Sequence, residues 1–134
     1  MGGIIANSLS LQIRNVLDPH KELDMNAKSL PAYLIGKLRI KDSEDYMNRY
    51  GLPVITLLEA AGAEILAVSP EPEILEGEWD SNWTVIIKFP SVSAAKQFYA
   101  SGEYAPYLSL RMNELTERGS LALLEGFDPA ALGL

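Results

Sequence analysis

The sequence contains no cysteine and only one histidine among its 134 residues. The missing cysteines exclude disulfide bonds, thiolate nucleophiles and iron–sulfur clusters, and together with the single histidine they exclude zinc sites built from several Cys or His ligands. No apolar run approaches the roughly 20 residues that a transmembrane helix needs. We therefore expect a cytoplasmic protein that holds no metal and does not span a membrane.

Basic residues are also scarce. Eleven Lys and Arg stand against eighteen Asp and Glu, which gives a formal net charge of −7. An acidic chain repels nucleic-acid phosphates and anionic lipid headgroups, and no cluster of basic residues offsets that repulsion. Binding to nucleic acid or to a membrane surface is therefore not expected.

The residues that are present are typical of a globular domain. With 48% hydrophobic and 22% charged residues, a chain of 134 residues has room for one domain. Residues 1–29 are balanced in charge and form an N-terminal extension, in which the apolar spacing predicts an amphipathic helix over residues 7–17. Residues 30–126 form the domain, and residues 127–134 form a short C-terminal tail.

Two kinds of apolar spacing alternate along the domain. Alternation of apolar and polar residues predicts four strands, at residues 32–41, 64–69, 83–89 and 121–125. Apolar residues three and four apart predict three helical regions, at residues 43–61, 91–102 and 104–119. Gly51 and Pro53 predict a kink or a break in the first helical region, and Gly119 is expected to end the third.

The order of these elements, β-α-β-β-α-β, predicts an α+β domain of the ferredoxin-like kind with one antiparallel sheet. Right-handed connections place both helical regions on the same face of that sheet. The opposite face of the first strand then carries Tyr33, Ile35, Lys37 and Arg39. Such a half-apolar face favours a partner sheet, so we expect a homodimer.

Residues 30–126 resemble a bacterial family known as domain of unknown function 1330, within the group of dimeric α+β barrels. The resemblance depends on short motifs in a fixed order: Tyr33, Asp45-Tyr46, Gly62, Glu76-Gly77, Phe89-Pro90-Ser91, Ala95 with Tyr99, Ser101-Gly102-Glu103-Tyr104, Leu108 to Arg111, and Glu125-Gly126. It implies two ferredoxin-like subunits packed sheet to sheet, with a cavity between the sheet and the helices of each. It implies no particular activity.

Relatives in the wider group suggest which cofactors to consider. Some of them bind haem through a histidine, but the single histidine here, His20, lies in the extension. Neither a haem ligand nor a histidine base is therefore available within residues 30–134, and we expect no cofactor. Other relatives oxidise aromatic compounds or isomerise lactones without a cofactor, using polar and aromatic side chains of the cavity. Residues of these types in this chain are Asn82, Trp79, Trp83, Tyr33 and Tyr104.

Six residues are candidates for binding a ligand: Tyr33, Arg39, Glu76, Trp79, Tyr104 and Arg111. Arg39 and Arg111 are the basic residues most expected to turn inward, where a guanidinium recognises a carboxylate through two hydrogen bonds. An ion pair with Glu64, Glu76 or Glu103 is the structural alternative. Trp79 and Trp83 are equally suited to stacking on a substrate and to covering a dimer interface.

The acidic run that contains Glu76 has two interpretations. Five carboxylates between residues 71 and 80 are of the type that binds a hard cation, but they lack the spacing of a calcium loop, which favours a solvated loop. Glu76 precedes Gly77, which suits a tight turn, so a structural carboxylate there is favoured over a general base.

Three functions remain open on this basis. The first is a cofactor-independent enzyme, an oxygenase or an isomerase, that acts on an anionic or aromatic metabolite. The second is a module that binds a small organic ligand, or protects it, without catalysis. The third is a structural dimer whose N-terminal helix contacts a partner. The sequence does not decide whether the protein is an enzyme.

Overall fold

The computed structural model describes residues 30–134, which belong to two compact units. Pro31–Glu125 is the larger unit, and residues 126–134 belong to the other. Residues 126–134 contain one 3-10 helix, η3 (Pro129–Leu132), where the side chain of Asp128 accepts a hydrogen bond from the amide of Ala130. The helix predicted over residues 7–17 lies outside the described residues.

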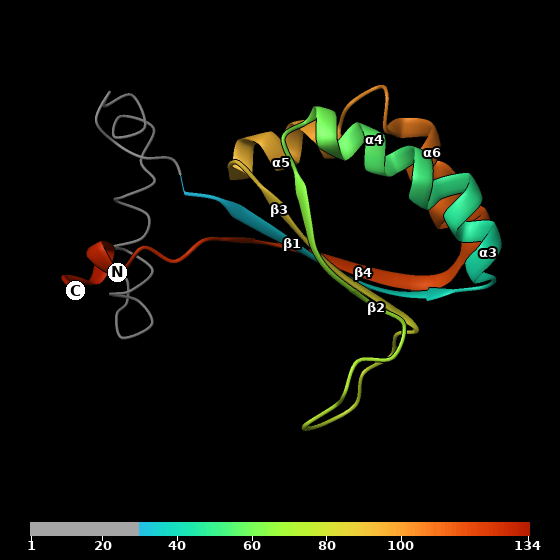
Figure 1. The fold of residues 1–134 in the computed structure, drawn as a ribbon, viewed down its shortest axis with the longest axis horizontal. Helices are drawn as coiled ribbons and strands as arrows, with labels where there is room; N and C mark the ends of the chain where they lie inside the picture. The colour runs from blue at the N-terminus through green and yellow to red at the C-terminus, as the bar shows by residue number, and fades with distance from the viewer. Residues whose placement is uncertain (1–29) are drawn as a thin grey trace. The chain divides into compact units, whose positions relative to one another are not determined.

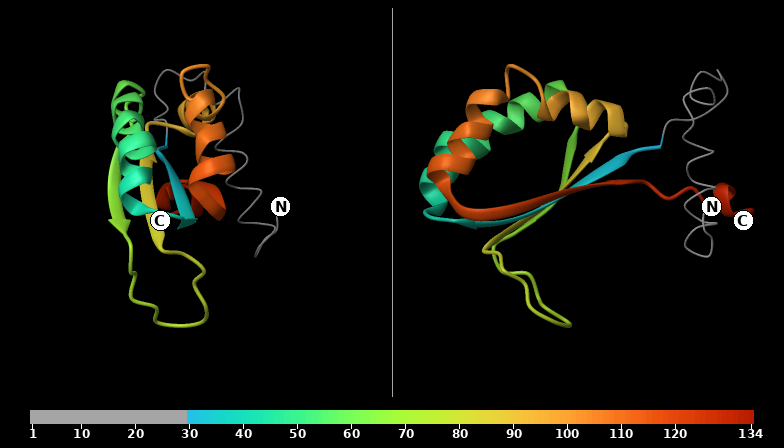
Figure 2. Two further views of the ribbon diagram at one scale, coloured as in Figure 1. Left: turned by 90° about the vertical axis from the view of Figure 1, so that its right-hand side faces the viewer. Right: turned by 180° about the vertical axis from the view of Figure 1, so that it is seen from behind.

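The larger unit is built on one antiparallel sheet of four strands. These are β1 (Ala32–Ile40), β2 (Glu64–Ser69), β3 (Trp83–Phe89) and β4 (Thr116–Glu125). Their order across the sheet is β2-β3-β1-β4, with β1 in the centre between β3 and β4. All the helices of this unit lie on one face of the sheet (Figures 1 and 2), so the predicted ferredoxin-like architecture is confirmed.

The helical regions are each made of more than one kind of turn. The elements are α3 (Ser43–Tyr46), η1 (Met47–Gly51), α4 (Leu52–Ala60), α5 (Val92–Tyr99), α6 (Ala105–Leu110) and η2 (Arg111–Leu115). Both η1 and η2 are π-helical. Two helices begin at polar caps, because Asp42 accepts from the amide of Asp45 at 2.9 Å and Ser91 accepts from the amide of Ala94 at 3.0 Å.

A kink or a break was predicted at Gly51 and Pro53, and the break is not observed. Both Gly51 and Leu52 keep right-handed helical backbone angles, and the amide of Leu52 donates to the carbonyl of Met47, five residues back. The helix thus widens into a π turn, and Pro53 follows in the first turn of α4, where a missing amide proton costs little.

The prediction that Gly119 ends the third helical region is wrong. The helical turns end at Leu115, and β4 begins at Thr116, whose hydroxyl donates to the carbonyl of Arg111 at 2.8 Å. Gly119 lies opposite Leu38 within the sheet. A Cβ atom at Gly119 would lie 2.6 Å from Cδ2 of the buried Leu38, so the glycine serves close packing and not a helix end.

The two faces of the sheet differ, as the alternation along β1 predicts. Leu38 and Ile40 are buried in a cluster with Tyr46 and Leu115 under the helices. Tyr33, Ile35, Lys37 and Arg39 occupy the alternate positions, which point away from the helices. We call this second surface the open face. Among the described residues, no helix is long and apolar enough to cross a membrane.

A long connection joins β2 to β3. Residues 70–82, which we call the arm, extend away from the sheet on the side opposite to the helices (Figures 1 and 2). The left-handed backbone of Gly77, with φ of +78°, lies within the arm, as the tight turn predicted. The arm therefore projects beyond the open face.

Candidate functional site

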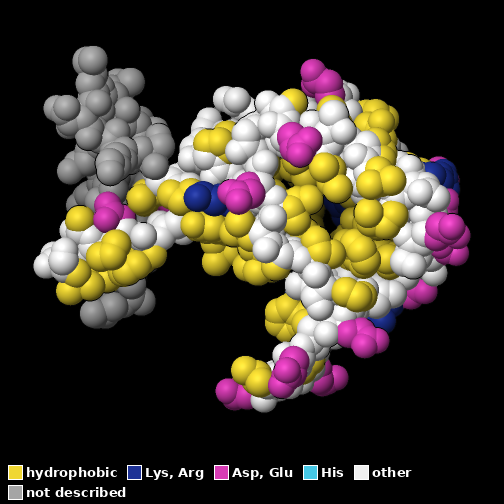
Figure 3. Space-filling model, in the orientation of Figure 1, with side chains coloured by type: hydrophobic (Ala, Val, Ile, Leu, Met, Phe, Trp, Pro, Cys, Tyr) yellow, Lys and Arg dark blue, Asp and Glu magenta, His cyan; other side chains and the backbone are white. Residues whose placement is uncertain are grey.

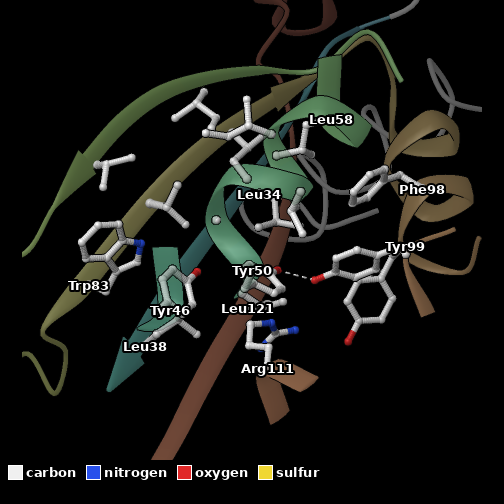
Figure 4. A pocket seen from close by; sticks show the side chains of 18 of the residues that line it. Leu34, Leu38, Tyr46, Tyr50, Leu58, Trp83, Phe98, Tyr99, Arg111 and Leu121 are labelled. Carbon is white, nitrogen blue, oxygen red and sulfur yellow. Dashed lines mark hydrogen bonds between the residues drawn. The ribbon is translucent and has the colours of Figure 1, made fainter. Parts of the chain in front are cut away.

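A cavity of about 110 Å³ lies between the sheet and the helices of the larger unit. All four strands and the helices α4 and α5 contribute apolar side chains to its wall, among them Leu34, Leu58, Ile65, Ile87, Phe98 and Leu121 (Figure 4). In the space-filling view, hydrophobic side chains surround a hollow near β2 and α4, and a basic side chain is visible inside it (Figure 3). We call this space the sheet–helix cavity.

A glycine lets the sheet side of the cavity close tightly. Gly36 lies in the centre of β1, opposite Val85 on β3 and Leu121 on β4. A Cβ atom at Gly36 would lie 2.8 Å from Cδ2 of Leu121 and 3.1 Å from Cγ1 of Val85. Because no side chain separates them, Leu121 and Val85 both reach the cavity and make this wall apolar.

Two tyrosine hydroxyls meet at the cavity wall. The hydroxyls of Tyr50 and Tyr104 are 2.5 Å apart and form a hydrogen bond (Figure 4). Burial, with smaller effects of Tyr104 and Tyr46, raises the pKa of Tyr50 well above its usual value, so Tyr50 keeps its proton at neutral pH. Their mutual hydrogen bond uses one of the two phenolic protons, and the other is available to a third group.

Arg111 brings a positive charge to the same place. Its side chain lines the cavity, is only 5% exposed, and has its guanidinium carbon 5.9 Å from the centre of the Tyr50 ring. Burial lowers the pKa of Arg111, but interactions with Tyr50 and Tyr104 raise it on balance, so the guanidinium stays charged. Within residues 30–134, Arg111 has no ion-pair partner, and its buried Nε atom makes no hydrogen bond.

The two π turns hold these polar groups in place. Tyr50 belongs to η1 and Arg111 to η2. Arg49 of η1 donates to Glu114 of η2 at 2.8 Å on the outer surface, and also to Asp45 at 3.2 Å. Such exposed ion pairs add little stability, but they link the two turns whose inner residues form the polar part of the cavity. Wide π turns occur often at functional sites.

An aromatic wall completes the site on the side of β3. The ring of Tyr46 lies 5.0 Å from that of Tyr50 and 5.5 Å from that of Trp83. Both tyrosines fall within the helical region predicted over residues 43–61, and neither was among the six candidate residues. The sequence feature that could have identified them is their spacing of four residues beside Gly51, but the same spacing is typical of ordinary core packing.

Two of the six candidate residues, Tyr104 and Arg111, come together at the sheet–helix cavity. The expectation that Arg39 turns inward is wrong, because Arg39 lies on the open face and donates to Asp80 at 3.1 Å. The reason is the alternation along β1, which points Leu38 and Ile40 toward the helices and Arg39 away from them. The partner of Arg39 is thus Asp80, which was not among the carboxylates considered.

The other three candidates also lie outside the cavity. Tyr33 is on the open face, and Trp79 packs there, donating from its indole nitrogen to the hydroxyl of Thr84 at 2.9 Å, with the amine of Lys37 4.3 Å from its ring centre. Glu76 is an exposed residue of the arm. By contrast, Trp83 lines the cavity, although the sequence did not distinguish its role from that of Trp79.

Two further expectations concern polar residues of the arm. Asn82 has a structural contact, since its side chain accepts from the amide of Ile40 at 2.7 Å and donates to the carbonyl of Ile40 at 3.0 Å. The carboxylates of the acidic run are exposed. In the part of the chain that the structure describes, no three His, Cys, Asp or Glu residues are grouped to hold a metal ion.

Comparison with known proteins agrees with this fold. The model of a family described as a domain of unknown function, DUF1330, matches residues 31–127. A solved protein of unknown function from Rhodopseudomonas palustris is 20% identical, with a TM-score of 0.61 over 84% of this chain and 97% of that one. A putative antibiotic biosynthesis monooxygenase from Bacteroides thetaiotaomicron is 13% identical, with a TM-score of 0.42 over 74% and 90%. No curated protein matches.

Proposed function

The chain belongs to the DUF1330 family, and from this premise we propose that its sheet–helix cavity binds a small organic molecule with an apolar body and one anionic oxygen group. The observation that carries the proposal is Arg111, a buried charge at an apolar cavity with no counter-ion among the described residues. An unpaired buried charge is costly, and a bound anion would offset that cost.

The wall of the cavity favours the apolar body. Apart from Arg111 and the tyrosines, the residues around it are almost all aliphatic or aromatic. A volume of about 110 Å³ is in the range of the roughly 150 Å³ cavity known to accept benzene. A molecule with a single six-membered ring therefore has a suitable size.

The polar corner of the cavity, formed by Arg111, Tyr50 and Tyr104, favours the anionic group. A guanidinium is a planar fork of donors that matches the two oxygens of a carboxylate, and its buried Nε has no other partner in residues 30–134. The Tyr50–Tyr104 pair lies beside it and can donate one more hydrogen bond. In a cavity of low dielectric constant, such charge-assisted hydrogen bonds are stronger than in water. An aromatic carboxylate or a phenolate fits this arrangement.

A second candidate function is a cofactor-independent enzyme of the oxygenase or isomerase type. The Tyr50–Tyr104 pair next to Arg111 favours it, because a proton donor and a fixed positive charge stabilise a negative oxygen that develops during a reaction. Among residues 30–134, those that line the cavity include no carboxylate and no imidazole, so the described part of the chain offers it no evident general base. Binding of an already anionic ligand is therefore the simpler function, and it is the one we propose.

We further propose that the protein is a homodimer formed through the open face. Register places Ala67, Ile86, Ile35 and Ala122 in one row across the four strands. On one side of this apolar row is the polar row of Ser69, Thr84, Lys37 and Ser120. An apolar centre with a polar rim is the usual composition of a protein interface, and a second copy of the same face is self-complementary.

A thermal-shift titration tests the binding proposal with two ligands of equal size, benzoate and neutral benzyl alcohol. We expect benzoate to stabilise the protein according to RT ln(1 + [L]/Kd), with at least a tenfold preference over benzyl alcohol. In Arg111→Met that preference should disappear. Methionine fills a similar volume without a charge, so this variant should fold.

Lys41→Met is the control, since it also replaces a positive charge by methionine but at an exposed residue that does not line the cavity. It should keep the preference for benzoate. The proposal fails if benzoate does not stabilise the wild-type protein, or if Arg111→Met retains the same preference for the anion. Conversion of a bound compound, followed by mass spectrometry, would instead favour the enzymatic candidate.

A further inference from the structure

The tip of the arm carries exposed apolar side chains. Leu75 is 86% exposed and Ile74 is 42% exposed, although both lie between the acidic residues Glu73 and Glu76. Since the arm projects beyond the open face (Figures 1 and 2), whatever covers that face lies beside it. We propose that the arm of one copy clasps the open face of a second copy, an inference that depends on the proposed dimer.

The base of the arm is fixed to the sheet. Asp80 accepts from Arg39 of β1 at 3.1 Å and from Arg118 of β4 at 3.0 Å, so one carboxylate bridges a central strand and the neighbouring edge strand. The side chain of Asn82 makes two hydrogen bonds with the backbone of Ile40, and the indole of Trp79 donates a hydrogen bond to the hydroxyl of Thr84. An arm held in one direction loses little conformational freedom when it binds, which favours association.

Charge favours a second copy as the occupant. The arm contains five acidic residues and no basic residue, and four of the acids, Glu71, Glu73, Glu76 and Glu78, lie on its exposed part. The strands of the open face carry four basic residues, Lys37, Arg39, Lys88 and Arg118, against Glu64. Arg39 and Arg118 already pair with Asp80 of the same chain, so Lys37 and Lys88 are the charges that a second copy meets. Each copy thus carries an acidic arm and basic residues on its open face, so two copies related by a twofold axis attract each other at two equivalent contacts.

The same argument selects where the tip binds. Two arms at the same end of the dimer would bring like charges together, so the twofold axis must place each arm at the opposite end of the partner's sheet. There, register sets Glu64, Lys88, Tyr33 and Leu124 in one row, with Glu64 on the edge strand β2. Leu124 is 47% exposed, and Lys88 has no ion-pair partner among the described residues. This row offers an apolar contact for Leu75 and a positive charge for the glutamates.

The arm is long enough for this contact. Each of its two legs has about six residues, which at 3.3 Å per residue reach roughly 20 Å. Two packed sheets are separated by about 10 Å. A twofold axis through the middle of the open face places the partner's Tyr33–Lys88 row beneath the base of the arm. The tip of the arm can therefore reach this row.

Photo-crosslinking of the full chain tests the inference. Leu75 is replaced by p-benzoylphenylalanine, which forms a bond with a nearby C–H group on illumination. We expect a covalent dimer in which mass spectrometry locates the second attachment within residues 31–35, 86–89 or 121–125. The same replacement at Leu52, an exposed leucine of α4 on the helix side, should give no covalent dimer. Lys88→Glu should reduce the dimer yield from position 75 at least fivefold.

The outcomes separate this inference from the proposed dimer and the proposed ligand. Crosslinks from position 75 that stay within one chain, or that attach to helix residues of the second copy, would overturn the clasp. If sedimentation shows a dimer and position 75 gives no covalent dimer, the clasp is overturned while the dimer stands. Ligand binding is measured independently of both, by the preference for benzoate.

Discussion

At the scale of single residues, two glycines determine how closely β1 approaches its neighbours in the sheet. Gly36 brings Leu121 and Val85 together at the cavity, and Gly119 accommodates the side chain of Leu38. Leu38 is one of the largest fully buried side chains, so it has little freedom to move aside. At these two positions glycine is required because it has no side chain, and not because of the freedom of its backbone.

Gly119→Ala should lower the free energy of unfolding by about 1 to 3 kcal/mol, the usual cost of overpacking a core. The added methyl group would lie 2.6 Å from Cδ2 of Leu38. Urea unfolding followed by circular dichroism measures the change. Gly102→Ala is the control, since nothing lies within 4 Å of a Cβ atom there, and equal stability of the two variants would contradict the packing role.

Residue types alone identified Tyr104 and Arg111 but not Tyr50. A buried arginine is unusual enough to suggest a site, whereas a tyrosine at helical spacing has the same pattern as a core residue. The pairing of the Tyr50 and Tyr104 hydroxyls joins residues 54 positions apart. Contacts at such separations depend on the fold, so a single sequence does not show them.

At the scale of elements, the strands were predicted better than the helix ends. The predicted strand over residues 83–89 coincides with β3, because β-branched and aromatic residues before Pro90 mark it clearly. Gly51 and Pro53 indicated a disturbance of the helix but not its form, a π turn. For β4, the glycine at position 119 was mistaken for a helix end, and the strand begins earlier, at Thr116.

The base of the arm should make stability depend on pH. Hydrogen bonds from Arg118 and then Arg39 lower the pKa of Asp80 to about 2, below its ordinary value. A lowered folded-state pKa contributes stability at pH values above about 4, and this contribution is lost as the pH falls toward 2. Asp80→Asn should therefore lower the melting temperature slightly at pH 7, with a difference that shrinks as the pH falls toward 2 and disappears only below it.

Melting curves recorded from pH 7 to pH 2 measure this difference. Glu78→Gln is the matched control, since Glu78 is an exposed acid of the same arm without an ion pair among the described residues. It should follow the wild-type curve. A constant difference between Asp80→Asn and wild type at every pH would show that the ion pairs with Asp80 do not cause it.

At the scale of the whole molecule, the order of elements predicted the topology, and the alternation along β1 predicted which face is left uncovered. Both follow from local patterns and from the handedness of connections. The presence of a sheet–helix cavity came from family resemblance, and its polar corner came from the structure. Apolar residues predict that a core exists, but not where its packing leaves a space.

Ile86→Glu should convert the proposed dimer into a monomer. Ile86 lies in the middle of the apolar row of the open face, next to Ile35 and Ala67. A charge in the desolvated centre of an interface is costly, so we expect the dimer dissociation constant to rise at least tenfold. Sedimentation velocity measures it, with circular dichroism to verify folding.

Leu52→Glu is the control, because Leu52 is also apolar, is 56% exposed and belongs to α4, on the other side of the sheet. It should sediment like the wild-type protein. A wild-type chain that remains monomeric at all concentrations, or an Ile86→Glu chain that remains dimeric, would contradict the proposed interface.

The sheet–helix cavity also bears on how the protein responds to hydrostatic pressure. The folded chain leaves a space of about 110 Å³ between the sheet and the helices, and this space is eliminated when the chain unfolds. Compression favours the state of smaller total volume, so pressure acts on this fold through its void. A ligand that occupies the space removes part of that volume difference, which would make the loaded protein less compressible and more resistant to pressure than the empty one.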